Sequence, residues 1–119
     1  MRNTAFILLS LSLFFGPELS FVKNRIVNAG QYREGEMIEI AAKIKNSGDE
    51  DLLIMSTVAS CNCTSVRYPK NAIPAGEEEE IKVTIDTKGK SGPGTVVVKI
   101  VTNTSDKYSI IRVDYEIMD

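Results

Sequence analysis

The chain has 119 residues, carries 14 lysines and arginines against 16 aspartates and glutamates, and contains no histidine. This length suits one domain with a single modest core, and the slightly acidic balance lacks the basic footprint of a nucleic-acid-binding protein. Without histidine, the chain cannot build a Ser-His-Asp triad, a Cys-His pair or a histidine-ligated zinc site from its own residues.

The N-terminus has the composition of an export signal. Arg2 supplies a positive charge, Ala5–Phe15 is a mostly apolar run, and Gly16-Pro17 interrupts it. The run is shorter than the ~20 apolar residues that span a bilayer, but it suits the apolar region of a signal peptide. The processing site after Ser20 is poor, because Glu18 stands where a small residue is usual. The alternative interpretation of this stretch is a buried strand or helix at the N-terminus of the domain.

We therefore predict a signal peptide over residues 1–20 and one domain over residues 21–119. No cysteine follows the apolar run, so the sequence does not indicate a lipoprotein anchor. The predicted localisation is export to the periplasm or cell envelope, with no stable membrane span after processing.

The domain begins with two predicted strands. Ile26–Gly30 is a candidate edge strand, with Gly30 marking a bulge or turn. Alternating apolar and charged residues predict a half-buried strand over residues 38–45, because successive side chains of a strand point to opposite faces. Asn46–Asp49 then predicts a turn, since Asn, Gly and Asp tolerate the backbone angles that tight turns need.

A third strand is predicted over Asp51–Ala59. Its alternation places Leu52, Ile54 and Val58 on one face and Leu53, Met55 and Thr57 on the other. Residues 65–76 contain two prolines and a glycine, which indicates a crossing loop with at most a short edge strand around Val66.

Three further strands are predicted in the last third of the chain. The acidic run Glu77–Glu80 indicates the solvated start of a strand whose apolar residues are Ile81, Val83 and Ile85. Alternation then predicts strands over residues 96–101 and 110–117, separated by polar turns. No segment after the signal has a helical period, so the fold class is an all-β, immunoglobulin-like antiparallel two-sheet sandwich of about seven strands.

Several short motifs occur in a characteristic order. The motifs are Asn46–Leu52, Ser60–Thr64, Tyr68–Lys70, Ile73–Glu77 and Asp86–Gly92. Their combination resembles the domain-of-unknown-function family 1573 (DUF1573), an immunoglobulin-like family of exported, largely bacterial proteins. The resemblance covers about Val27 to Ile117. It implies the fold and the export but no mechanism.

The chain departs from the family pattern between its two cysteines, where the family usually has Gly and this chain has Asn62. Asn is the non-glycine residue that best tolerates a left-handed backbone. We therefore predict a tight turn with a positive φ angle at Asn62.

Three interpretations of Cys61 and Cys63 stay open. They are small, half-buried residues that close a strand. They form a bridge or pair with another chain, although an extended i, i+2 pair separates the Cα atoms by about 6.5–7 Å and so requires a bend at Asn62. Or their thiolates hold a soft metal such as Cu(I).

We find no candidate catalytic or cofactor-binding residue and predict no cofactor. No metal site is predicted either, and Cys61 and Cys63 are the only candidates for one. The predicted function is an exported, non-enzymatic binding or structural module of the cell envelope. Its partner is an unknown protein that contacts the end loops or an edge strand, and not nucleic acid. The alternative is a thiol-redox or copper-handling protein that uses the Cys-Asn-Cys pair.

Overall fold

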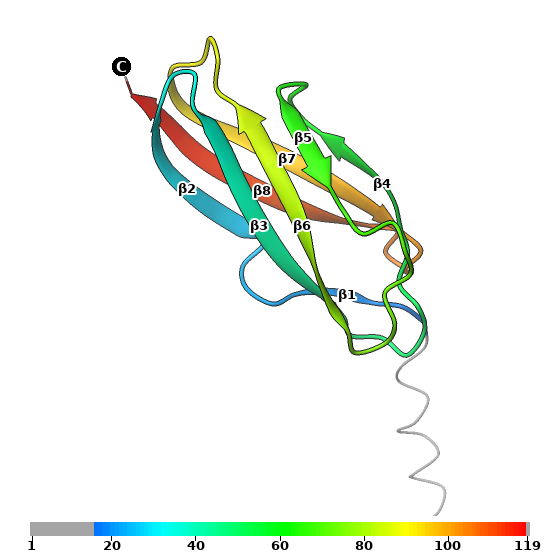
Figure 1. The fold of residues 1–119 in the computed structure, drawn as a ribbon. Helices are drawn as coiled ribbons and strands as arrows, with labels where there is room; N and C mark the ends of the chain where they lie inside the picture. The colour runs from blue at the N-terminus through cyan, green and yellow to red at the C-terminus, as the bar shows by residue number, and fades with distance from the viewer. Residues whose placement is uncertain (1–15, 119) are drawn as a thin grey trace, which may run out of the picture.

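The structure is a computed structural model that describes residues 16–118, and it is a sandwich of two four-stranded sheets (Figure 1). The strands are β1 (Leu19–Phe21), β2 (Ile26–Arg33), β3 (Met37–Asn46), β4 (Ile54–Ala59), β5 (Thr64–Arg67), β6 (Glu78–Asp86), β7 (Gly92–Thr102) and β8 (Tyr108–Met118). The first sheet has the order β1-β3-β6-β5, and the second has the order β2-β8-β7-β4. The predicted all-β, immunoglobulin-like class is confirmed.

Two details of the topology differ from the prediction. The described chain has eight strands, because the short strand β1 carries no alternation that the sequence could reveal. The second sheet is mixed, because β2 runs parallel to β8 while the other neighbours are antiparallel. Gly30 marks a bulge in β2, as predicted.

The core lies between the sheets and follows the predicted alternation. Ile81, Val83 and Ile85 of β6 are fully buried, while Lys82 and Asp86 beside them are exposed. The fully buried apolar side chains of the other strands are Ile38, Ile44, Val96, Val98, Ile100, Ile111 and Val113, and the loops add Leu52 and Ile73. Residues 78–80 are exposed, which confirms the solvated start of β6.

The predicted third strand is shorter than expected, and its faces are wrong beyond Ile54. β4 begins at Ile54, and Leu52 instead forms an isolated bridge with Ile73. The pairing with β7 shifts between Ile54 and Ser56, and such a bulge turns every later side chain to the opposite face. Val58 therefore points outward and is 58% exposed, although alternation placed it on the same face as Leu52 and Ile54, which are buried.

Residues 16–21 belong to the sandwich. Ser47 donates its backbone N–H to the Glu18 carbonyl at 2.9 Å, and Asp49 donates to the Gly16 carbonyl at 3.1 Å. The predicted end of the signal peptide at Ser20 thus falls inside β1, which pairs with β3. Most of the predicted signal, residues 1–15, lies outside the described residues. Across residues 16–118 there is no helix of the length and apolarity that crossing a bilayer requires.

Asn46, predicted only as a turn residue, is fully buried and joins three segments. Its Nδ2 donates to the carbonyls of Glu50 (2.7 Å) and Ile73 (2.8 Å). Its Oδ1 accepts from the N–H groups of Gly48 (3.0 Å) and Glu18 (3.4 Å). This side chain therefore ties the β3–β4 turn to the crossing loop and to the start of the described chain.

Candidate functional site

Cys61 and Cys63 form a disulfide in the turn between β4 and β5. Their Cα atoms are 5.1 Å apart, which is closer than an extended strand allows, so the predicted bend at Asn62 is present. The predicted positive φ at Asn62 is wrong, because Lys107 is the one non-glycine residue in the described chain with a positive φ. The bend is instead held by Thr64, which donates its N–H to the Cys61 carbonyl at 3.2 Å.

Both cysteines are half-buried and pack against the core, as the first interpretation expected, but they are bridged rather than separate thiols. A bridge across so short a loop stabilises a fold by only about 1.6 kcal/mol in the chain-entropy model. In the bridged state neither sulfur is a thiolate, so Cu(I) binding by this pair requires reduction first. Across the described residues, no group of three or more acidic or cysteine side chains is arranged to hold a metal ion.

Lys90 is the charged residue at this turn. It comes from the loop between β6 and β7, and its Nζ lies 3.5 Å from Cys61 Sγ. The N–H of Cys63 also donates to Cys61 Sγ at 3.1 Å, whereas Cys63 Sγ has Thr64 Oγ1 as a neighbour at 3.6 Å. The two sulfurs therefore differ in their polar neighbours, because only Cys61 Sγ has both an ammonium group and a backbone N–H within hydrogen-bonding distance.

The outer faces of the two sheets differ in composition. On the first sheet, opposite charges face each other across the strands, as Lys43 faces Glu80 and Lys45 faces Glu78. The strands of the second sheet carry six of the nine exposed large apolar side chains, namely Ile26, Met55, Val58, Tyr108, Ile110 and Met118. The second sheet therefore exposes more large apolar side chains on its outer face than the first sheet does.

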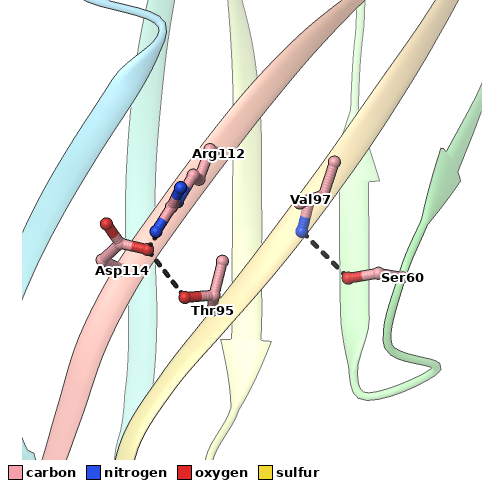
Figure 2. Close-up of polar contacts among 5 residues, drawn as sticks. All are labelled: Ser60, Thr95, Val97, Arg112 and Asp114. Carbon is pink, nitrogen blue, oxygen red and sulfur yellow. Dashed lines mark hydrogen bonds and ion pairs between the residues drawn. The ribbon is translucent and has the colours of Figure 1, made fainter.

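A polar cluster interrupts this apolar face (Figure 2). Asp114 accepts a hydrogen bond from Thr95 Oγ1 at 2.8 Å and pairs with Arg112 Nε at 3.0 Å. These contacts, with the Thr95 hydrogen bond as the largest, hold the pKa of Asp114 below its ordinary value of 3.8. At the other side of the sheet, Ser60 Oγ accepts from the N–H of Val97 at 2.9 Å and anchors the start of the disulfide turn.

The first four residues of β8 have a strand partner on one side only. β7 pairs with β8 from Tyr108 onward, but β2 begins its pairing at Arg112. Upstream of that point the chain leaves the sheet, because β1 pairs with β3. We call Tyr108–Ile111 the open edge of β8.

The backbone direction at the open edge follows from a neighbouring bond. Arg112 donates its N–H to the Arg25 carbonyl at 2.9 Å, on the β2 side. Backbone groups of a strand alternate in direction, so Tyr108 and Ile110 aim their N–H and C=O groups the same way. Among the described residues no strand pairs with these groups.

A groove of about 610 Å³ lies beside the open edge. Its apolar lining comes from Leu19, Phe21, Ile26, Tyr108 and Ile110, and its charged lining from Arg25, Arg112 and Asp106. The exposed fractions of Ile26 and Tyr108 are 55% and 47%. An unpaired strand edge beside exposed apolar groups can add an extended peptide as a further strand.

The sequence predicted that a partner contacts the end loops or an edge strand, but it did not identify β8 as that strand. The alternation in β8 is that of an ordinary half-buried strand. A signal was nevertheless present. Ile110 and Ile111 are consecutive, as are Val96, Val97 and Val98. Consecutive apolar residues are typical of strands that are covered on both faces.

Known structures share the fold at low identity. A protein of unknown function from Porphyromonas gingivalis W83 matches with a TM-score of 0.73 and 18% identity, over 85% of this chain and 47% of that one. The VesB protease of Vibrio cholerae matches with a TM-score of 0.67 and 15% identity, over 95% of this chain and 34% of that one. The seventh PapD-like (ASH) domain of human CEP192 matches with a TM-score of 0.67 and 9% identity, over 91% of this chain and 92% of that one.

The chain thus spans less than half of the Porphyromonas and VesB chains. Similarities at these identities establish the architecture and no activity. No curated protein matches the chain. The family described as "Protein of unknown function (DUF1573)" matches residues 19–117, and the chain therefore belongs to that family.

Proposed function

We propose that the protein is an exported, non-enzymatic binding module of the cell envelope that holds an extended segment of a partner protein against the open edge of β8. The observation that carries this proposal is the coincidence of backbone groups that lack a strand partner with a groove of mixed apolar and charged lining. The signal-like N-terminus supports the export. The lack of a base and of an oxyanion device in the sequence supports a binding role.

The open edge defines the partner segment. Four residues of a strand extend about 13 Å, so the segment contributes about four or five residues. Alternate side chains of such a segment would contact the apolar lining near Ile26 and Ile110. An acidic residue at one end would meet Arg25, because the guanidinium of Arg112 is already paired with Asp114.

Photo-cross-linking in the cells that make the protein tests this proposal. A photoreactive residue replaces Ile110 at the open edge, and the matched control replaces Lys82 on the charged outer face of the first sheet. We expect a covalent adduct with a segment of another protein from position 110 and none from position 82. Equal adducts at both positions, or none at position 110, would contradict the proposal.

Proline substitution tests the backbone pairing with the cross-linked partner. Ile110→Pro removes an N–H that points into the groove, and the ladder with β7 is kept through Ser109 and Ile111. Thr57→Pro is the matched control. The N–H of Ser60 points toward β7, because it donates to the Val97 carbonyl. Backbone groups alternate in direction along a strand, so the N–H of Thr57 points away from β7, out of the opposite edge of the sheet. We expect the affinity for the partner to fall about tenfold or more in Ile110→Pro and to stay unchanged in Thr57→Pro.

A further inference from the structure

We propose that the Cys61–Cys63 bridge is a second, independent site that exchanges with the dithiol of a partner protein, with Cys61 as the departing sulfur. The bridge lies on the β4 side of the second sheet, whereas the open edge lies on the β2 side of β8. A negative result for exchange at the bridge would therefore not contradict peptide binding at the open edge, and the reverse also holds. Three features support exchange: the bridge closes a short loop, backbone hydrogen bonds also hold the turn, and one of the two sulfurs lies beside an ammonium group.

The bridge closes a very short loop, with one residue between the cysteines. Short loops give the smallest stabilisation, so opening the bridge costs the fold little. Asn62 at the tip of the turn is exposed, which leaves the turn accessible to another protein.

Backbone hydrogen bonds hold the turn independently of the sulfurs. Ser60 donates its N–H to Val97 at 2.8 Å, and Asp86 donates to the Cys63 carbonyl at 2.9 Å. Thr64 closes the turn with its bond to the Cys61 carbonyl. The two cysteines consequently stay adjacent after reduction, and the bridge can form again without refolding.

Lys90 makes the two sulfurs unequal. An ammonium group 3.5 Å from Cys61 Sγ stabilises negative charge on that sulfur, and the N–H of Cys63 adds a second donor. A nearby cation favours the thiolate form of a cysteine, and a more stable thiolate leaves faster in exchange. The geometry therefore makes Cys61 the leaving group and Cys63 the sulfur that is attacked.

The exchange step follows from this assignment. A thiolate of the partner attacks Cys63 Sγ, the bond between the two protein sulfurs breaks, and its electron pair goes to Cys61 Sγ beside Lys90. The partner's second thiolate then attacks its own sulfur in the mixed disulfide and releases Cys63 as a thiolate. In the net reaction, the partner dithiol is oxidised to a disulfide with the loss of two electrons and two protons. The Cys61–Cys63 bridge is reduced by the same two electrons, and its two thiolates take up two protons from solution.

The adduct formed with reduced glutathione tests the assignment in the unmodified protein. The folded, oxidised protein is mixed with excess glutathione, quenched with an alkylating reagent and mapped by peptide mass spectrometry. We expect a transient glutathione adduct on Cys63 and an alkylated Cys61, with the fold retained by circular dichroism. A bridge that persists in excess glutathione, or an adduct mainly on Cys61, would overturn the proposal.

Substitution of Lys90 tests the source of the asymmetry. In the reduced protein, Lys90→Met should slow the alkylation of Cys61 near neutral pH, because the ammonium group that favours the thiolate is lost. It should also slow the opening of the bridge by glutathione about twofold. Lys90→Gln serves in the same way if the methionine variant folds poorly, and Lys90→Arg should restore most of both effects because it keeps the charge.

Lys88→Met is the matched control, since Lys88 is exposed in the same loop. We expect it to leave the alkylation rate of Cys61 and the exchange rate unchanged. If Lys90→Met changes neither quantity, or if Lys88→Met changes both equally, Lys90 has no specific role and the proposal fails.

Discussion

Asn46 shows how much one polar residue can organise and how little of that role is visible in a sequence. Its place before Ser-Gly-Asp identifies a turn, because these residue types suit tight turns. Its contacts with Glu50, Ile73 and Glu18 depend on segments that only the fold brings together. Local propensity predicts the turn, and the buried network requires the tertiary structure.

Replacement of Asn46 should therefore weaken the whole sandwich. Asn46→Ala leaves two carbonyls and two N–H groups without their partner, and we expect the free energy of unfolding to fall by about 3 kcal/mol. Asn28→Ala is the control, because Asn28 is exposed and accepts one bond from Gly30; about 0.5 kcal/mol is expected. Urea denaturation measures both, and equal losses would contradict the role of Asn46.

Asp114 provides a test by pH. Its pKa is lowered in the folded protein, so its contribution to stability is present above the ordinary value of 3.8 and is lost as the pH falls through the folded value. Thr95→Val removes the largest cause of the lowering. We expect the pKa of Asp114 to rise toward 3.8 in this variant, as followed by carboxyl NMR titration. An unchanged titration would show that the Thr95 hydrogen bond does not act on this group.

At the scale of elements, regular alternation predicted the strands that face the core and failed where the backbone breaks its own period. The bulge after Ile54 moves Val58 to the outer face, and no residue type in that stretch marks the shift. β1 has three residues, too few for a period of two to emerge. The parallel pairing of β2 with β8 depends on where the chain crosses between sheets, which is a property of the whole fold.

The contribution of β1 can be measured by a double-mutant cycle. A chain that begins at Phe21 lacks the carbonyls of Gly16 and Glu18, and we expect it to lose about 2–3 kcal/mol relative to one that begins at Gly16. Gly48→Ala should destabilise the longer chain, because an added Cβ would lie 2.7 Å from the Glu18 nitrogen. It should have little effect in the shorter chain. Additive losses in urea denaturation would contradict the contact.

At the scale of the molecule, the sandwich presents one charged face and one face with exposed apolar groups. The strand pattern predicted a sandwich with a protein partner at its end loops or an edge strand but could not select a surface, because each strand alone looks half-buried. The surface emerges from the offset between β1 and β2, which leaves Tyr108–Ile111 of β8 without a strand partner on the side of the groove. Family membership adds the architecture and leaves the partner to experiment.

The most direct test of partner binding at the open edge is amide hydrogen exchange of the unmodified protein, measured with and without the partner that cross-linking identifies. We expect exchange at Tyr108 and Ile110 to slow about tenfold or more on binding, because their N–H groups become part of a ladder. Thr57 and Ala59, on the opposite edge of the same sheet, should be unaffected. Unchanged exchange at Tyr108 and Ile110 with the partner bound, or protection of the β4 edge instead, would contradict the proposed function.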